Sequence, residues 1–180
     1  MKFTETPLSG AYLVEAEPHA DERGFFARTA CTDAFAEHGL NGQFVQQSVS
    51  FNIHRGTLRG LHFQAAPHEE DKLVRVTRGV IFDVIVDIRP ASPCFGKWFG
   101  VELSADNTKQ LYIPKGFAHG FQTLEDNSEV LYAMTVPYQA GFGRGIRWDD
   151  AAIGVDWRGA PSVIAARDLD LPLLAECELT

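Results

Sequence analysis

The chain has 180 residues, and 45% of them are apolar, which is enough for one domain with a substantial core. The formal net charge of −8 argues against a general nucleic-acid-binding protein. No stretch approaches the roughly 20 consecutive apolar residues of a membrane span, and the first residues lack the apolar region of a secretory signal. We therefore expect a single domain over residues 1–180, with neither nucleic acid nor a membrane as its partner.

In chain order, the first predicted element is a helix that Thr32 caps and Gly39 ends, with Ala34, Phe35 and His38 on one side. Short segments rich in β-forming residues follow, separated by turn-forming residues. The predicted strands are Phe44–Phe51, Thr57–Gln64, Leu73–Val76, Val80–Ile88, Trp98–Leu103, Leu111–Ile113, Ala118–Leu124 and Val130–Val136. A short second helix is expected around Leu171–Ala175. Many short strands at this spacing predict a sandwich, jelly roll or barrel rather than a sheet built from βαβ units.

The three cysteines, Cys31, Cys94 and Cys177, are far apart in the chain. An odd number at wide spacing matches neither a disulfide framework nor a zinc-binding pattern. We therefore expect free thiols in a reducing compartment, which indicates a cytoplasmic protein.

Two histidines, a lysine and a tyrosine fall on or beside the predicted strands. His62 ends Leu-Arg-Gly-Leu-His at 58–62, Lys72 opens the next apolar run, and His119 and Tyr132 lie on two later strands. These residue types suit carbon-acid chemistry next to a carbonyl. The histidine removes a C–H proton, the lysine stabilises the enolate oxygen, and the phenol returns a proton.

Positive charge is concentrated in one part of this acidic chain, at Arg55, Arg59, Lys72, Arg75 and Arg78. A local basic pocket suits a small anionic ligand such as a nucleotide phosphate. The alternative is that these side chains are solvated charges at strand edges.

Strict alternation along a strand places Arg59 and His62 on opposite faces of the sheet. Two explanations allow both to line one pocket. Either Gly60 marks a bulge, or one of the two residues serves a site completed by a neighbouring subunit.

Eight ordered sequence blocks extend along nearly the full length of the chain. The blocks are Asp-Glu-Arg-Gly-Phe-Phe (21–26), Phe-Val-Gln (44–46), Gly-Thr-Leu-Arg-Gly-Leu-His-Phe-Gln (56–64), Lys-Leu-Val-Arg-Val (72–76), Phe-Asp-Val-Ile-Val-Asp-Ile-Arg (82–89), Gly-Lys-Trp-Phe-Gly-Val-Glu-Leu-Ser-Ala (96–105), Leu-Tyr-Ile-Pro-Lys-Gly-Phe-Ala-His-Gly-Phe (111–121) and Arg-Gly-Ile-Arg-Trp-Asp-Asp (144–150). Together they resemble the dTDP-4-dehydrorhamnose 3,5-epimerase family. The resemblance implies a cupin-type jelly roll, an antiparallel β-sandwich or barrel with a few short helices. It also implies a homodimer with strand exchange that acts on a dTDP-4-keto-6-deoxyhexose and supplies deoxysugars for surface polysaccharide.

The resemblance assigns four catalytic roles. His62 is similar to the base that removes protons beside the keto group, and Asp168 to the carboxylate that orients this base. Lys72 is similar to the cation that stabilises the enolate oxygen, and Tyr132 to the general acid that reprotonates the opposite face. Without the motif, each residue has an alternative structural role. His62 is then a hydrogen-bonded core histidine and Asp168 a helix N-cap. Lys72 is an exposed lysine, and Tyr132 is a half-buried strand tyrosine.

Six further positions match the family's contacts to the nucleotide sugar, namely Arg23, Gln46, Arg59, His119, Tyr138 and Arg167. Arginine forks suit a diphosphate because each fork donates two parallel hydrogen bonds. Tyr138 falls where an aromatic side chain stacks on the thymine ring. For Arg23 and Arg59, the alternative role is a structural ion pair.

The resemblance implies an enzyme without a cofactor or a metal. Metal-binding cupins usually carry His-x-His followed by a glutamate, whereas this chain has Leu-His-Phe-Gln at 61–64. His62 and His119 without a clear third ligand make a poor metal site. The 4-keto group acidifies the hydrogens at both neighbouring carbons, so acid–base chemistry and oxyanion stabilisation suffice.

Three positions depart from the family pattern in the pocket wall. Arg28 and Gly143 stand where many members have a glutamate, and Ser48 stands where an asparagine is common. The competing functions are a 3- or 5-mono-epimerase, a sugar-nucleotide 3,4-ketoisomerase on the same scaffold, and a non-catalytic nucleotide-sugar binder. A binder needs neither His62 nor Tyr132, which argues against the last of these.

Overall fold

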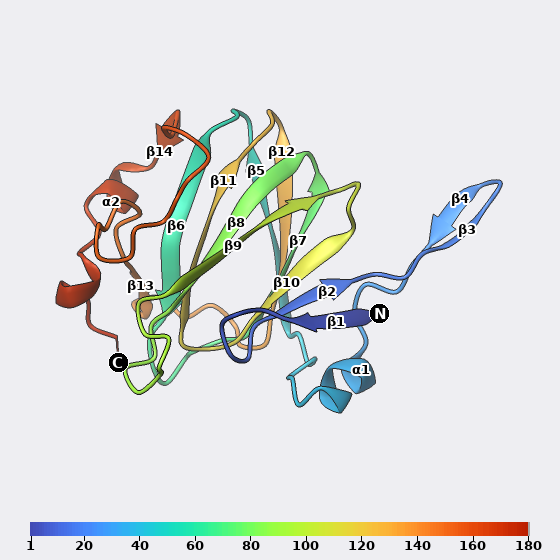
Figure 1. The fold of residues 1–180 in the computed structure, drawn as a ribbon, viewed down its shortest axis with the longest axis horizontal. Helices are drawn as coiled ribbons and strands as arrows, with labels where there is room; N and C mark the ends of the chain where they lie inside the picture. Colours follow the sequence, from blue (N-terminus) through green and yellow to red (C-terminus); the bar gives the residue numbers. More distant parts are fainter. Residues whose placement is uncertain (180) are drawn as a thin grey trace.

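The computed structural model describes residues 1–179, and two β-sheets that face each other form the body of the molecule (Figure 1). The first sheet has the strand order β1–β2–β10–β7–β12–β5. The second has the order β13–β6–β11–β8–β9, with β14 parallel to β6 at one side. This architecture confirms the predicted all-β, cupin-type sandwich.

The strands of the first sheet are β1 Lys2–Glu5, β2 Tyr12–Glu15, β5 Gln46–Asn52, β7 Lys72–Arg78, β10 Lys109–Ile113 and β12 Ser128–Met134. Those of the second sheet are β6 Thr57–Gln64, β8 Val80–Asp87, β9 Trp98–Ser104, β11 Phe117–Thr123, β13 Gly143–Gly145 and β14 Val163–Ile164. All eight predicted strands are confirmed, with ends that differ by at most two residues. The prediction omitted the N-terminal strands and the short strands β13 and β14.

The first helix, α1, covers Thr32–Glu37 and begins one residue earlier than predicted. Its N-cap is Cys31, and Thr32 already belongs to the helix, so the predicted cap is wrong. The hydroxyl of Thr32 donates instead to the Gly42 carbonyl oxygen at 3.4 Å. Gly39 follows the helix with a φ of +70°, which fits the predicted end.

The C-terminal segment contains two short helical pieces in place of the one predicted around residues 171–175. α2 covers Ala166–Leu169, and a 3-10 helix, η1, covers Leu174–Glu176. Pro172 separates them, because the residue before a proline avoids helical geometry. Among residues 1–179, no helix has the length and apolar character needed to cross a membrane.

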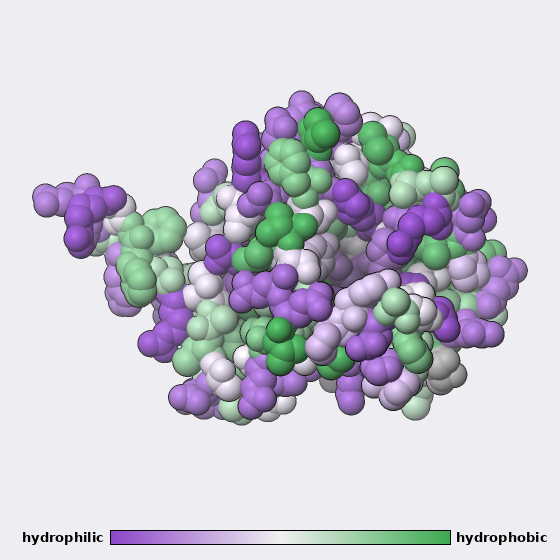
Figure 2. All heavy atoms as spheres, turned by 180° about the vertical axis from the view of Figure 1, so that it is seen from behind, coloured by the Kyte–Doolittle hydropathy of each residue, from purple (hydrophilic) through white to green (hydrophobic). Residues whose placement is uncertain are grey.

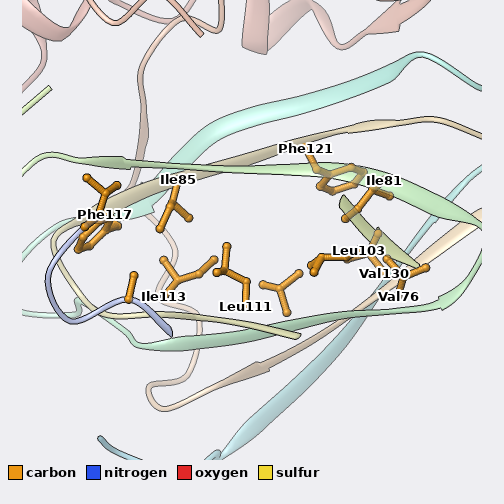
Figure 3. Close-up of a cluster of buried hydrophobic side chains, with 12 residues drawn as sticks. Val76, Ile81, Ile85, Leu103, Leu111, Ile113, Phe117, Phe121 and Val130 are labelled. Carbon is orange, nitrogen blue, oxygen red and sulfur yellow. The ribbon is translucent and has the colours of Figure 1, made fainter. Parts of the chain in front are cut away.

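The main core lies between the two sheets (Figure 3). Side chains alternate along a strand, so Ile81 and Ile85 of β8 point into this core, whereas Phe82, Val84 and Val86 point to the other face. The first sheet contributes Val74, Val76, Leu111, Ile113 and Val130 to the same core. β8 is therefore buried on both faces, which explains its nearly continuous apolar sequence.

Part of the outer face of each sheet is covered as well. The C-terminal part of the chain packs Ile146, Ile153 and Leu174 against the outer face of the second sheet. Helix α1 packs Phe35 against Tyr112 and its neighbours on the first sheet. This C-terminal covering of the second sheet brings α2 next to β6.

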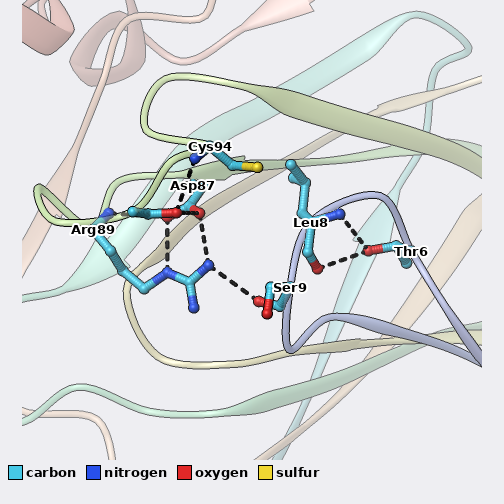
Figure 4. A network of polar contacts seen from close by, with 7 residues as sticks. Thr6, Leu8, Ser9, Asp87, Arg89 and Cys94 are labelled. Atoms are coloured by element: carbon cyan, nitrogen blue, oxygen red, sulfur yellow. Dashed lines mark hydrogen bonds and ion pairs between the residues drawn. The ribbon is translucent and has the colours of Figure 1, made fainter.

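A polar network ties the N-terminal loop to the end of β8 (Figure 4). Arg89 forms an ion pair of 2.6 Å with the buried Asp87 and donates to the Ser9 carbonyl oxygen at 3.1 Å. Burial alone would raise the pKa of Asp87, but hydrogen bonds from Arg89 and Ser92 outweigh burial and lower it. The carboxylate therefore stays ionised and anchors this end of the sandwich.

An arm projects from the body of the molecule (Figures 1 and 2). It is a two-stranded hairpin of β3 His19–Asp21 and β4 Gly24–Phe26. Phe25 and Phe26 are 63% and 79% exposed. An isolated hairpin is marginally stable in water, so this arm needs a surface to pack on.

Candidate active site

A bulge in β6 brings Arg59 and His62 to the same side of the second sheet. β6 pairs with β11 with a shift in register, so that two residues of β6 lie opposite Gly120. Gly60 has a φ of +125°, and a Cβ at this position would lie 2.6 Å from the Gly120 Cα. Only glycine fits such a position. Of the two explanations that alternation left open, the structure shows the bulge, and both side chains line one cleft.

His62 forms a hydrogen-bonded pair with Asp168. The Nε2 of His62 lies 2.8 Å from Oδ1 of Asp168, and Oδ2 accepts from the Gly60 backbone N–H at 3.2 Å. Asp168 lies inside α2, whose N-cap is Ala165, so it does not serve as the helix cap. Burial would raise the pKa of Asp168, but the hydrogen bond and charge of His62, with the Gly60 N–H, lower it below its usual value.

Lys72 and Tyr132 reach the same cleft from the first sheet. Lys72 lies opposite Met134 in the pairing of β7 with β12, and alternation puts Tyr132 on the same face as Met134. The Tyr132 ring contacts the His119 ring edge-on, with centroids 5.7 Å apart, which joins the two sheets across the cleft. Burial and the nearby Asp83 carboxylate raise the pKa of Tyr132, so its phenol keeps the proton at neutral pH.

His119 belongs to a second histidine–carboxylate pair. Its Nε2 lies 2.7 Å from Oδ1 of Asp83, and both side chains are buried. Asp83 Oδ2 has no hydrogen-bond partner among residues 1–179. Asp83 was not among the site residues predicted from the sequence. The available signal was a carboxylate on the inward face of an otherwise apolar strand.

Glu70, which was also not predicted from the sequence, lines the cleft beside Lys72. Glu70 Oε1 lies 3.0 Å from Lys72 Nζ. Gln64 donates one amide hydrogen bond to the other Glu70 oxygen and one to the His68 carbonyl oxygen. The signal in the sequence was an acidic residue two positions before the lysine, a spacing that places both on one side of extended chain.

Four other predicted contact residues lie at or near the cleft. Arg59 donates from Nε to Asn52 Oδ1 at 2.7 Å, so an amide rather than an ion pair holds it. Gln46 accepts the Tyr138 backbone N–H on its Oε1 at 3.0 Å, and the Tyr138 side chain is 64% exposed. Arg167 lies at the cleft opening and is exposed, with its Nε 3.3 Å from an oxygen of Asp168.

The structure keeps Arg23 away from the cleft of its own chain. Arg23 lies at the tip of the projecting arm, where it pairs with Asp21 at 2.5 Å. This ion pair matches the alternative role that the sequence left open for Arg23. Both side chains of this ion pair are exposed to solvent.

Two adjoining cavities form the cleft, with volumes of about 390 and 460 Å³. Their common wall consists of His62, Glu70, Lys72 and Arg167. Arg59, His119 and Tyr132 line the smaller cavity, and Tyr138 and Gly143 line the larger one. A cleft of this size accommodates a small organic ligand. The space next to Gly143 is open. Because glycine has no side chain to fill this space, the larger cavity extends to the backbone at this position.

His62 and His119 are neighbours on adjacent strands, as the sequence allowed. Each is engaged by its own carboxylate. Within residues 1–179, no group of three His, Cys, Asp or Glu side chains is placed to hold a metal ion.

Known proteins of one family resemble this chain over most of its length. A family model described as dTDP-4-dehydrorhamnose 3,5-epimerase matches residues 5–176. The dTDP-4-dehydrorhamnose 3,5-epimerase of Methanothermobacter thermautotrophicus is 48% identical over 156 residues, which are 87% of this chain and 83% of that protein.

Two solved structures share the fold over most of their length. The Legionella pneumophila dTDP-6-deoxy-D-glucose-3,5-epimerase in complex with dTDP-4-keto-L-rhamnose has a TM-score of 0.92 and 37% identity, covering 97% of this chain and 93% of that one. A 3′-monoepimerase from Streptomyces bikiniensis in complex with dTDP-quinovose has a TM-score of 0.87 and 30% identity, covering 95% of this chain and 88% of that one. With the family model covering nearly the whole chain, the protein belongs to the dTDP-4-dehydrorhamnose 3,5-epimerase family.

Proposed function

We propose that the protein epimerises dTDP-4-keto-6-deoxyglucose at C3 and C5 to give dTDP-4-keto-rhamnose, in the cytoplasm and without a cofactor. One observation carries the proposal: a histidine–carboxylate pair and a partly buried tyrosine lie on facing sheets of one cleft. Inversion at carbon needs a base on one side of the sugar and an acid on the other. A base that returns its own proton regenerates the starting configuration.

His62 is the base in this proposal. Because its Nε2 points at Asp168, the ring presents Nδ1 to a ligand. Nδ1 takes the proton from C3 or C5, and the resulting imidazolium is stabilised by the ionised carboxylate of Asp168. The lowered pKa of Asp168 keeps that carboxylate ionised at neutral pH.

Lys72 and Tyr132 complete each inversion. When the C–H bond breaks, its electron pair moves onto the 4-keto oxygen, and the Lys72 ammonium stabilises this oxyanion by several kcal/mol in a dry site. Tyr132 then gives its phenolic proton to the carbon from the opposite face as the C=O bond re-forms. Exchange with water returns a proton to Tyr132 and removes one from His62, which readies the site for the second carbon.

Three side chains around the catalytic group suit the nucleotide part of the substrate. Arg59 and Arg167 are guanidinium groups at the cleft that fit the diphosphate. Tyr138, exposed beside the larger cavity, offers a ring face for the thymine base.

Proton NMR of dTDP-4-keto-6-deoxyglucose incubated with the protein in deuterated water tests the function. Deuterium at both C3 and C5 of an epimerised product is the expected result. No deuterium at either carbon, from folded protein, would reject this substrate. His62→Ala is expected to bind dTDP with unchanged affinity in calorimetry and to lose exchange at both carbons, and full exchange in this variant would remove His62 from the mechanism.

A mono-epimerase is the second candidate, because the 30%-identical neighbour is a 3′-monoepimerase and the cleft is open beside Gly143. Deuterium at one carbon only would establish that activity. A product with the keto group moved to C3 would instead identify a 3,4-ketoisomerase. Tight dTDP binding without exchange would identify a non-catalytic binder.

We further propose that the protein acts as a homodimer in which the arm of each chain completes the partner's cleft. The exposed Phe25 and Phe26 on the projecting hairpin support this arrangement, since they need a surface. Strand β5 offers one, because Val49 and Phe51 are exposed on this edge of the first sheet. Arg23 at the arm tip then reaches a nucleotide in the partner's site.

Mixing two inactive variants tests the crossing of the arm. His62→Ala disables the base, and Arg23→Ala disables the arm. If arms cross, a mixed dimer has one cleft with both native residues, so unfolding and refolding an equal mixture restores about a quarter of wild-type activity. If each arm serves its own cleft, every site in the mixture keeps one defect and no activity returns.

A further inference from the structure

Glu70 and Lys72 form an ion pair in the wall of the cleft. The Oε1 and Nζ atoms are 3.0 Å apart, and the side chains are only 7% and 12% exposed. Both residues line both adjoining cavities. An unpaired buried ammonium carries a large desolvation cost, so the Glu70 carboxylate stabilises the charged Lys72 in this position.

The carboxylate also limits where the ammonium lies. A lysine side chain is a flexible four-carbon stem that does not hold its own tip in place. The stem of Lys72 starts on β7, between Ile113 on β10 and Met134 on β12. With the tip held by Glu70 through one N–H donor, two donors are left for a ligand oxygen.

Gln64 in turn fixes Glu70. Its Nε2 donates to the second Glu70 oxygen and, at 2.9 Å, to the His68 carbonyl oxygen. Its Oε1 accepts the Gln139 backbone N–H at 2.7 Å. The buried amide thus connects the backbone of two loops to the carboxylate, so Glu70 is held through the oxygen that does not pair with Lys72.

We propose that Glu70 is a positioning residue for the epimerisation, an inference that rests on the function proposed above. Glu70 holds the Lys72 ammonium where the 4-keto oxygen becomes negatively charged. Its loss affects the transition state more than substrate binding, because Arg59 and Arg167 supply the charges for the diphosphate elsewhere in the cleft.

Glu70→Ala and Glu70→Gln test this role, with Glu69→Ala as the matched control. Glu69 lies in the same loop with the same charge but lines a different cavity. In Glu70→Ala, kcat is expected to fall about 10- to 100-fold, while KM changes less than about 3-fold, since a misplacement of about 1 Å has this effect on rate. Glu70→Gln keeps an oxygen that accepts from Lys72, so part of kcat returns. Glu69→Ala behaves as the wild type.

A second readout needs no substrate. NMR detects a lysine ammonium only where pairing and burial slow its exchange with water, and Lys72→Arg assigns the signal by removing it. The Lys72 signal is expected in the wild type and in Glu69→Ala and is expected to vanish in Glu70→Ala.

Persistence of that signal in Glu70→Ala refutes the positioning of Lys72 by Glu70. Unchanged kcat, or a KM that rises as far as kcat falls, refutes the catalytic consequence. If the wild-type protein shows no epimerase activity, the proposed function is refuted instead. In that case, the NMR signal of the Lys72 ammonium alone tests whether Glu70 holds Lys72 in place.

Discussion

Replacing Gly60 with alanine tests whether the bulge in β6 builds the cleft. Two energetic costs arise at this position. A φ of +125° is rarely adopted by residues with a side chain and costs about 1–3 kcal/mol. The new Cβ would lie 2.6 Å from the Gly120 Cα and 2.8 Å from the His119 carbonyl oxygen. These are backbone atoms that cannot rotate away, so the contact adds about 1–3 kcal/mol.

Together the two costs predict that the free energy of unfolding falls by about 2–6 kcal/mol. For a chain of this length, about 1 kcal/mol corresponds to a change of about 2–4 °C in Tm. Thermal unfolding followed by circular dichroism measures the effect, at one protein concentration because self-association shifts the apparent stability. Gly143→Ala is the control, since Gly143 also borders β6 but has open space around it, and its effect stays within about 0.5 kcal/mol.

The same variant reports on the cleft. If the alanine removes the bulge, alternation turns Arg59 or His62 to the other face of the sheet. The folded fraction of Gly60→Ala then loses solvent exchange at the sugar carbons or loses affinity for dTDP. A Gly60→Ala protein with wild-type Tm and wild-type exchange would refute both the energetic estimate and the role of the bulge.

Three further predictions concern single side chains. Asp168→Asn lowers exchange about 10²- to 10⁴-fold in the NMR assay, because an amide does not stabilise the His62 imidazolium. Folding lowers the pKa of Asp168 below its usual value of 3.8, so the ionised carboxylate stabilises the folded wild type above pH 3.8. This stabilisation is lost as the pH falls through the folded-state pKa. The urea midpoints of the wild type and of Asp168→Asn are therefore expected to converge in acid. Tyr132→Phe still incorporates deuterium through His62 but with retained configuration, and an inverted product would exclude Tyr132 as the acid. Arg89→Ala removes the partner of the buried Asp87 carboxylate and is expected to lower the free energy of unfolding in urea by about 2–4 kcal/mol. Arg147→Ala breaks an exposed ion pair and is expected to lower it by less than about 1 kcal/mol. Equal losses in the two variants would contradict the role of burial.

The strands that form the sandwich were predictable because their apolar residues and turn signals are local. β8, for example, is buried on both faces and reads as an apolar run between two turns. The strands β1, β3 and β4 were not predictable in this way, since most of their residues are exposed and show no alternation of burial. The helix expected at residues 171–175 failed because Pro172 interrupts it.

The site was predictable only where the family motif covers it. His62 and Asp168 are 106 positions apart, and no local pattern connects them. Their contact depends on the C-terminal segment covering the second sheet, which is a property of the whole fold. Glu70 was missed because an acidic residue in a loop reads as solvated charge until the fold buries it against Lys72.

The division of the proposed catalytic group between the two sheets bears on how many carbons are inverted. His62 belongs to the second sheet, and Lys72 and Tyr132 belong to the first, with the His119–Tyr132 contact joining the sheets across the cleft. A single base and a single acid on opposite sides can invert only a carbon that lies between them. The two carbons beside one keto group must therefore take that place in turn while the oxygen stays near Lys72. In this geometry, the freedom of the sugar to turn within the cleft decides between single and double epimerisation.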